Sequence, residues 1–314
     1  MKRSVNIKKD NQVGVGVKVS VIILNWNRKE DVSLTLTKLS NQTAKPFEII
    51  VVDNASTDGS IKHITKHFPK VKIVKLLKNI GLAGFNLGME SALGDYFLLL
   101  ASDSIPNDDL IAKHLTKFKN NPSLGVSCPS TFELQTKKYL APNRAKEGNN
   151  KLGYTVTYFD GNGICLRREV FKKTGGYAND YFICLEELEW AVRILSMGFE
   201  IKCFTDAVVY NSKALVGGEA RKRYGYYYAR NWIWFYIQYL PLTEIPSFLS
   251  LHAQSFFVKT NKKAGTMTKL DILKGIFSGF VGSVKYIRQR KVLSPDIIDR
   301  LKLDLFPNSK HLYT

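Results

Sequence analysis

The sequence lacks three features that mark large classes of protein. Its four cysteines are widely spaced and form no CxxC pair, which argues against a zinc site or a disulfide framework and indicates buried free thiols in a reducing cytosol. The N-terminus is basic but has no apolar core segment, so it does not resemble a secretory signal. No stretch reaches roughly 18 uninterrupted apolar residues, so no transmembrane helix is predicted.

Acidic residues are scarce relative to basic ones. The 314 residues include 46 Lys and Arg but only 27 Asp and Glu, which gives a net charge of +19. Such a balance implies a polyanionic neighbour, which is nucleic acid, an anionic membrane surface or a phosphorylated substrate. The 45% of hydrophobic residues is typical of a globular protein with a real core. The length allows one large domain, or one domain with an appendage.

The order of apolar segments predicts alternating strands and helices. Short apolar runs bounded by turn residues predict strands at 17–24, 47–52, 71–76 and 97–101. Helices are expected at 30–39, 60–67 and 89–93, with 79–88 as a loop. This spacing is typical of an α/β fold with a parallel sheet and helices on both faces. Residues 1–16 are polar, and a flexible tail is expected there.

The strand at 97–101 is the segment around which the rest of the chain is organised. Its continuous apolar character predicts burial on both faces, and it delivers Asp103 to its carboxyl end, where open α/β sheets bind ligands. A carboxylate there can hold a divalent metal, and the metal can hold phosphates. The alternative is an aspartate that caps the next turn, which is the more common role of a lone Asp.

Seven segments together carry a family resemblance. In chain order they are VSVIILNWNR, VVDNASTDGS, NIGLAGFNLG, LLLASDS, GNGICLRREVFKKTGGY, FICLEELEW and GYYYARN. They resemble the GT-A glycosyltransferases of family 2, particularly the branch that includes bacterial rhamnosyltransferases, from about Val19 to about Tyr239. The resemblance implies a Rossmann-like nucleotide-binding GT-A domain at 17–225, with a mostly parallel sheet, and a C-terminal helical extension at 226–314.

The resemblance also implies a reaction. A sugar is transferred with inversion from a nucleoside-diphosphate sugar, a UDP- or dTDP-sugar, to an acceptor hydroxyl in the synthesis of cell-surface polysaccharide or glycolipid. Rhamnose is the commonest sugar of the branch, but the residues do not identify the donor. The implied cofactor is Mg²⁺ or Mn²⁺, which bridges the two phosphates and neutralises charge on the departing nucleoside diphosphate.

Two segments besides the organising strand are candidates for donor binding. The resemblance gives Asp53 the role of binding the nucleoside, whereas Asp58 is as well suited to capping the following helix. The small residues at 79–88 allow close approach of the backbone to a nucleotide or close helix packing. The predicted donor-binding residues are Asn25, Asn27, Asp53, Asn54, Ser56, Asn79, Gly81, Gly84, Asn86, Ser102, Asp103, Arg223 and Arg230.

The implied metal site and base depart from the family pattern. Ala101 occupies the first acidic position of the metal motif, so Asp103 remains as a ligand, and Asn211 stands where many relatives have a histidine ligand. Glu187 matches the catalytic base, with Glu in place of Asp, and Glu186 hydrogen-bonds the acceptor or orients the loop. Acidic residues are also favoured at any helix N-terminus by the helix dipole.

The C-terminal part is aromatic and basic. The segment around 221–230 either clamps a diphosphate through Arg223 and Arg230 or forms a solvated basic face. Residues 232–258 are apolar and aromatic, and 267–291 is predicted to be an amphipathic helix ending in basic residues. These features suit an interfacial membrane segment or helices packed on the catalytic domain. We expect a cytoplasmic protein, peripheral at the inner face of the membrane, with a glycan or lipid-linked acceptor.

Two other function classes remain open. A nucleic-acid-binding protein would account for the charge, but no segment resembles such a module, so no nucleic-acid partner is expected. A catalytically inactive sugar-nucleotide-binding relative would account for Ala101, Asn211 and Glu187. The enzyme hypothesis requires Asp103 and Glu187 to face one cleft, and it would be wrong if they lay on separate surfaces. The sequence does not indicate the oligomeric state.

Overall fold

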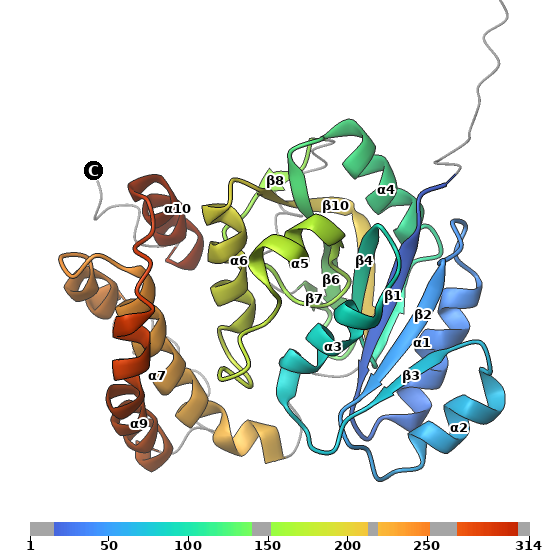
Figure 1. Ribbon diagram of the computed structural model, residues 1–314, viewed down its shortest axis with the longest axis horizontal. Helices are drawn as coiled ribbons and strands as arrows, with labels where there is room; N and C mark the ends of the chain where they lie inside the picture. Colours follow the sequence, from blue (N-terminus) through green and yellow to red (C-terminus); the bar gives the residue numbers. More distant parts are fainter. Residues whose placement is uncertain (1–15, 140–151, 213–218, 252–268, 307–314) are drawn as a thin grey trace, which may run out of the picture.

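The first part of the chain alternates strands and helices as the sequence predicts (Figure 1). The computed structural model describes residues 16–139, 152–212, 219–251 and 269–306. The first elements are β1 (Val19–Asn25), α1 (Lys29–Ser40), β2 (Glu48–Asp53), α2 (Ser60–His67), β3 (Lys72–Lys75), η1 (Gly81–Ala83), α3 (Gly84–Ser91) and β4 (Tyr96–Ala101).

The remaining elements complete the sheet and add a group of helices. They are β5 (Ser104–Pro106), α4 (Leu110–Asn120), β6 (Leu124–Glu133), β7 (Lys138–Tyr139), β8 (Tyr154–Thr155), β9 (Cys165–Arg167), α5 (Arg168–Thr174), α6 (Glu186–Ser196), β10 (Glu200–Asn211), α7 (Glu219–Tyr239), α9 (Lys269–Arg288) and α10 (Pro295–Leu305). The amphipathic helix predicted at 267–291 corresponds to α9, whereas α10 was not predicted.

The predicted loop at 79–88 is wrong, because a helix begins inside it. α3 starts at Gly84, and Gly84 and Gly88 pack so closely that an added Cβ would lie 2.7 Å from a methyl of Leu24 and 2.4 Å from a methyl of Ile22. Glycine lowers helix propensity by about 1 kcal/mol per residue. The tertiary packing that these glycines permit against β1 outweighs that preference.

The strands form one mixed sheet in the order β3-β2-β1-β4-β9-β6-β10-β5. β1 pairs in parallel with β2 and β4, β2 with β3, and β6 with β10, whereas the short β9 is antiparallel between β4 and β6. The fold is therefore α/β with its long central strands parallel. Because these strands are in register, Asn25 pairs with Asp53 and Leu24 with Ala101, so polar residues that follow them gather at one edge of the sheet.

Two hydrophobic cores cover the two faces of the sheet. β4 contributes to both, since Phe97 and Leu99 pack in one core and Leu98 and Leu100 in the other. The prediction that this strand is buried on both faces is confirmed. All four cysteines are buried, and none forms a disulfide within the described part of the chain.

Helices α7 and α10 share a hydrophobic core with α6. Leu188 and Val192 of α6 share a core with Trp232 and Phe235 of α7 and with Leu301 of α10. The boundary predicted at 225/226 falls inside the continuous helix α7. Within the described ranges, no helix is both long enough and apolar enough to span a membrane.

Helix α7 holds the segment that leads into α6. The side-chain Nδ2 of Asn231, which is fully buried, donates to the carbonyl oxygens of Tyr181, Ile183 and Cys184 at 3.0, 2.9 and 2.7 Å. Cys184 and its neighbour Leu185 have φ values of 72° and 66°, in a region that non-glycine residues occupy at an energetic cost. The Asn231 amide offsets that cost by satisfying carbonyls that this conformation would leave unpaired.

We predict that Asn231→Leu lowers the free energy of unfolding by about 1–3 kcal/mol, because buried carbonyls lose their donor. Gln238→Leu is the matched control in the same helix, since Gln238 is also buried but its Oε1 has no hydrogen-bond partner. Guanidinium denaturation followed by circular dichroism measures both. Equal losses in the two variants would contradict the role given to Asn231.

Candidate functional site

Residues from both halves of the predicted site line one cavity of about 960 Å³. Its wall is formed by the carboxyl end of β4, the 158–162 segment, the start of α6 and the side of α7. Asp103 and Glu187 both line it, which meets the condition that the enzyme hypothesis set. The other predicted site residues in the wall are Asn54, Asn79, Gly81, Ser102, Glu186 and Asn211.

Asp103 follows β4 on a turn that other elements fix. Its backbone oxygen accepts a hydrogen bond from the Ser212 amide at 3.1 Å, next to the end of β10. Its carboxylate Oδ2 lies 3.3 Å from Nη1 of Arg28, which also lines the cavity. Thr35 of α1 donates to the carbonyl oxygens of Ser102 and Ser104 at 2.9 and 2.7 Å. The carboxylate is therefore presented to the cavity by a rigid turn.

Glu186 and Glu187 are the first two residues of α6. Glu186 is 3% exposed, and its Oε2 has no hydrogen-bond partner. Glu187 lies against Gly161, where an added Cβ would come within 3.2 Å of its Oε1. Burial raises the pKa of both carboxyl groups above the ordinary range, and for Glu187 the neighbouring Glu186 and Asp160 add to the shift. Each group therefore takes up a proton more readily than a solvated glutamate.

Asp160 is a cavity residue that sequence reasoning missed. Its Oδ1 accepts from the Asn162 amide at 3.3 Å, while its Oδ2 is buried without a partner. Burial raises the pKa of Asp160 to about 6, and the charge of Asp103 adds to the shift. The only signal in the sequence is the turn pattern DGNG, in which Asp160 directly precedes the GNGICL motif.

The cavity is lined mainly by acidic rather than basic side chains although the chain is strongly basic. Asp103, Asp160, Glu186 and Glu187 line it, and Arg28 is the only Lys or Arg among the described residues in its wall. A diphosphate would not bind among these carboxylates without added positive charge. The oxygen atoms of Asp103, Asp160 and Asn211 are the donor type that Mg²⁺ and Mn²⁺ prefer, so the residues fit a divalent metal.

This donor set is incomplete on its own. Over the described ranges, no group of three or more His, Cys, Asp or Glu residues is arranged to hold a metal ion. Mg²⁺ usually keeps several waters and binds through one or two carboxylates together with substrate phosphates. A metal here therefore needs the phosphates of the donor to complete its coordination.

The predicted residues at the ends of β1 and β2 lie behind the cavity wall. Nδ2 of Asn25 donates to Oδ1 of Asp53 at 3.1 Å and to the Ser56 hydroxyl at 3.2 Å, and the Ser56 amide donates to Oδ2 of Asp53 at 3.0 Å. Asn27 accepts from the Thr57 amide at 2.7 Å. None of Asn25, Asn27, Asp53 and Ser56 lines the cavity, and Asp53 is 3% exposed, so these contacts stabilise the turn.

The carboxylate of Asp58 caps two helices. Its Oδ1 accepts from the Ser60 amide at 3.0 Å at the start of α2, and its Oδ2 accepts from the Lys29 amide at 2.9 Å at the start of α1. One carboxylate therefore satisfies unpaired amides at two helix N-termini.

The asparagines of the 79–88 segment have different roles. Asn54 and Asn79 line the cavity and fix the backbone of Gly81, which accepts from Nδ2 of Asn54 at 3.0 Å and donates to Oδ1 of Asn79 at 2.9 Å. Gly81 has a φ of 69°, and an added Cβ would lie 2.0 Å from the Phe182 carbonyl oxygen. The 79–81 segment thus touches the segment that leads into α6.

Two other predicted residues of this segment have packing roles. Gly84 packs on β1, as described above, and Asn86 exchanges two hydrogen bonds with the backbone of Tyr177 at 2.8 and 2.9 Å. Neither lines the cavity.

Arg230 of the predicted arginine clamp does not line the cavity. Arg230 is 9% exposed, donates to the Asp180 carbonyl at 2.7 Å and stacks over the Trp234 ring at 4.1 Å. It therefore holds the segment before α6 rather than facing a ligand. The side chain of Arg223 lies outside the described residues. From the predicted basic and aromatic segment, α7 instead contributes Tyr224 and Tyr227 to the wall.

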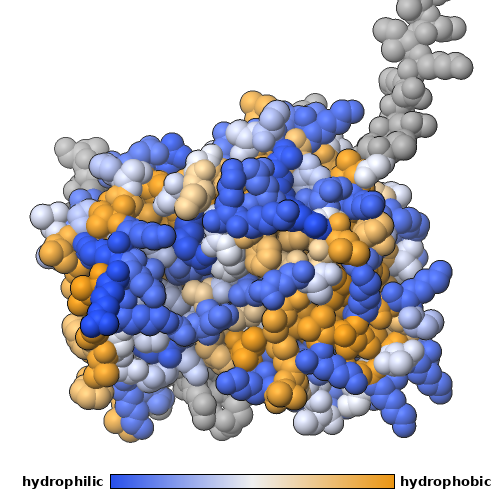
Figure 2. Space-filling model, viewed as in Figure 1, coloured by the Kyte–Doolittle hydropathy of each residue, from blue (hydrophilic) through white to orange (hydrophobic). Residues whose placement is uncertain are grey.

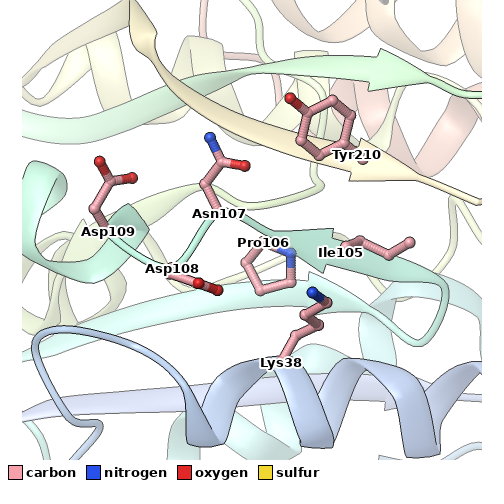
Figure 3. A pocket seen from close by; sticks show the side chains of 7 residues that line it. All are labelled: Lys38, Ile105, Pro106, Asn107, Asp108, Asp109 and Tyr210. Atoms are coloured by element: carbon pink, nitrogen blue, oxygen red, sulfur yellow. The ribbon is translucent and has the colours of Figure 1, made fainter.

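A second hollow, of about 460 Å³, lies between α1, β5 and β10 (Figure 3). Side chains of Lys38, Asp108 and Tyr210 are among those that line it, and none of the predicted site residues does. The chemistry-bearing residues are therefore gathered in the larger cavity.

Comparison with known proteins identifies the family. The profile of "Glycosyl transferase family 2" matches residues 20–175. The uncharacterized glycosyltransferase YfnE of Bacillus subtilis is 35% identical over 115 residues, which cover 35% of this chain and 29% of YfnE. The O-antigen chain rhamnosyltransferase RfbN of Salmonella typhimurium is 23% identical over 223 residues, which cover 66% of this chain and 70% of RfbN.

A solved structure supports the fold. Residues 1–349 of S. aureus TarS, in complex with UDP-GlcNAc, align with a TM-score of 0.54 and 17% identity, covering 69% of this chain and 66% of that one. This chain spans less than two thirds of the length of several curated relatives, YfnE among them. Through residues 20–175 the chain therefore belongs to glycosyl transferase family 2, and its sheet and flanking helices have the GT-A arrangement.

Proposed function

We propose that this protein is an inverting glycosyltransferase that moves a sugar from a nucleoside-diphosphate sugar to an acceptor hydroxyl. The observation that carries the proposal is the shared cavity. Asp103, suited to a metal-bound diphosphate, and Glu187, suited to accepting a proton, come from distant parts of the chain and line the same hollow. A donor bound on the Asp103 side and an acceptor bound on the Glu187 side would meet in this hollow, as displacement requires.

The donor is a UDP- or dTDP-sugar. Support for a uracil nucleotide comes from TarS, whose solved complex contains UDP-GlcNAc, and support for rhamnose comes from the more distant likeness to RfbN. In this protein Asn54, Asn79 and Ser102 present polar groups to the cavity at the carboxyl edge of the sheet, where α/β folds bind nucleotides. Asp53 is proposed to act on the nucleoside indirectly, by fixing the turn after β2.

Asp103 would hold Mg²⁺ or Mn²⁺, with Asp160 and Asn211 as further oxygen donors. When bound, the metal supplies positive charge that stabilises the leaving nucleoside diphosphate. Asp160 offers a carboxylate that the motif lacks because Ala101 occupies its first acidic position. Arg28, which pairs with Asp103, provides a second positive charge beside the phosphates.

Glu187 is the proposed general base. It takes the proton from the acceptor hydroxyl, whose oxygen forms the new bond to the anomeric carbon. The bond from that carbon to the phosphate oxygen breaks on the opposite face, so the configuration inverts. Glu186, buried beside it, orients the acceptor or the start of α6. The aromatic residues Tyr224, Tyr227 and Trp232 of α7 offer ring faces to an acceptor sugar.

The proposed setting is the synthesis of cell-surface polysaccharide or glycolipid at the cytoplasmic face of the membrane, on a glycan or lipid-linked acceptor. This setting rests on the RfbN likeness and on the basic character of the chain. The alternative function, donor binding without turnover, is favoured by Ala101 and Asn211 at motif positions, and the following experiments separate the two.

We predict that Glu187→Gln lowers kcat by about 10²–10⁴-fold while donor affinity stays close to that of the wild type, because a general base acts in the transition state. Donors are first ranked by thermal stabilisation with a panel of UDP- and dTDP-sugars, and release of nucleoside diphosphate is then measured. Glu169→Gln, at an exposed site on α5, is the control. Unchanged turnover in Glu187→Gln would show that Glu187 is not the base. Donor binding without turnover in the wild type would favour the alternative function, a catalytically inactive sugar-nucleotide-binding protein.

We predict that Asp103→Asn weakens Mn²⁺ binding in the presence of nucleoside diphosphate by at least tenfold, because a carboxylate ligand becomes a neutral amide. Electron paramagnetic resonance of Mn²⁺ measures binding independently of turnover. Asp109→Asn is the control, since Asp109 pairs with Lys113 outside the cavity. Equal Mn²⁺ affinity in Asp103→Asn and the wild type would contradict the site.

The pH dependence follows from the raised pKa of Glu187. A protonated base cannot accept a proton, so log kcat is expected to rise with pH and level off above a midpoint higher than the ordinary glutamate value of about 4.3. A raised pKa means that the folded state binds more protons than the unfolded state above pH ~4.5, so this group makes stability fall as pH rises.

Glu187→Gln is accordingly expected to abolish the pH-dependent limb and to raise Tm at pH 8, because the raised pKa of Glu187 costs the folded wild type free energy there. A midpoint at or below the ordinary glutamate range, or a lower Tm for the variant at pH 8, would show that burial does not tune this residue.

A further inference from the structure

Helix α9 exposes an apolar face along its whole length. Eight large hydrophobic side chains on this helix are 37–73% exposed. They are Leu270, Leu273, Ile276, Phe277, Phe280, Val281, Val284 and Ile287. Figure 2 shows hydrophobic residues along the edge of the molecule where Figure 1 places α9. A contiguous apolar face of this kind marks an interaction surface.

The opposite side of α9 is fixed against α7 by close contacts. A Cβ added to Gly275 would lie 2.3 Å from the Tyr226 carbonyl oxygen, and one added to Gly282 would lie 2.8 Å from the Trp234 ring. Nε1 of Trp234 also donates to the Gly279 carbonyl at 3.1 Å. The helix cannot turn its apolar side inward without breaking these contacts, so the outward face is a property of the fold.

The exposed charges on α9 beside the apolar face are positive, although Lys285 pairs with the half-exposed Asp180. The exposed charged positions of α9 are Lys274, Lys285 and Arg288, and its Asp271 is only half-exposed. The whole chain carries a net charge of +19, yet the cavity is lined by carboxylates, so this excess lies elsewhere. An apolar helix face flanked by Lys and Arg is complementary to an anionic bilayer surface.

A second copy of the chain fits this face less well. If two α9 helices paired antiparallel about a two-fold axis, Lys274 of one copy would lie within about one turn of Lys285 of the other. Asp180 pairs with Lys285, but no exposed acidic residue among the described side chains of α9 balances Lys274 and Arg288. Anionic lipid headgroups supply the missing negative charge. We propose that α9 docks the protein on an anionic membrane surface, with its apolar face buried at the level of the headgroups.

The docked orientation bears on the proposed reaction. α7 separates α9 from the cavity, because Tyr226 and Trp234 contact α9 while Tyr224 and Tyr227 line the cavity. The membrane surface would then lie behind the aromatic wall of the site, within reach of a lipid-linked acceptor. This last step rests on the proposed function, whereas docking does not.

The test is cosedimentation of the full chain with vesicles of phosphatidylcholine containing 30% phosphatidylglycerol. We expect the wild type to bind, and the double variant Phe277→Ser/Phe280→Ser to bind at least tenfold more weakly. Leu34→Ser/Met197→Ser is the matched control, because these residues are exposed on α1 and directly after α6 and should leave binding unchanged. Raising the salt concentration, or omitting phosphatidylglycerol, should weaken binding by the wild type.

Folding and function are checked separately from docking. The exposed Phe variants are expected to keep the wild-type Tm, and Glu187→Gln should bind vesicles like the wild type, so failure of the catalytic proposal leaves this result intact. Docking is overturned if the wild type does not bind anionic vesicles, or if Phe277→Ser/Phe280→Ser binds equally well. A third result would also overturn it. If the wild type is a dimer by light scattering, Phe277→Ser/Phe280→Ser is a monomer, and neither binds vesicles, then the face holds a second copy of the chain.

Discussion

The hydrogen bonds from Asn231 and Arg230 of α7 to the 180–184 backbone are the contacts on which the site depends. They hold a segment with left-handed residues directly before the first turn of α6, and that turn carries both cavity glutamates. Helix α7 is therefore part of the architecture that holds the cavity wall. An amide and a guanidinium, rather than a catalytic group, determine where the proposed base points.

The early fold could be predicted from the sequence because it depends on local patterns. The bounds of α2 and the double burial of β4 follow from apolar spacing and turn residues. The antiparallel β9 has three residues and is defined by its neighbours β4 and β6, so it has no pattern of its own. The start of α3 was missed because its glycines weaken local propensity while allowing close packing on β1.

The site could be predicted only in part, for a related reason. Family motifs and the end of a strand predicted four of the cavity residues, which are Asp103, Glu186, Glu187 and Asn211. Asp160 was missed because it lies on a turn without a distinctive pattern. Polar residues after a strand can face a ligand or hold the turn, and Asp53 holds the turn because Asn25 and the Ser56 backbone lie beside it. Arg230 was predicted by charge, but its neighbours are backbone carbonyls and rings.

The contact between Gly81 and Phe182 links the two sides of the cavity. Gly81 sits beside Asn54 and Asn79, and Phe182 belongs to the segment that positions Glu187. The backbones touch with no space for even a methyl group between them. A movement of residues 79–81 toward Phe182 would therefore displace the opposite wall as well, so a nucleotide bound on one side, as proposed, would shift the proposed base on the other.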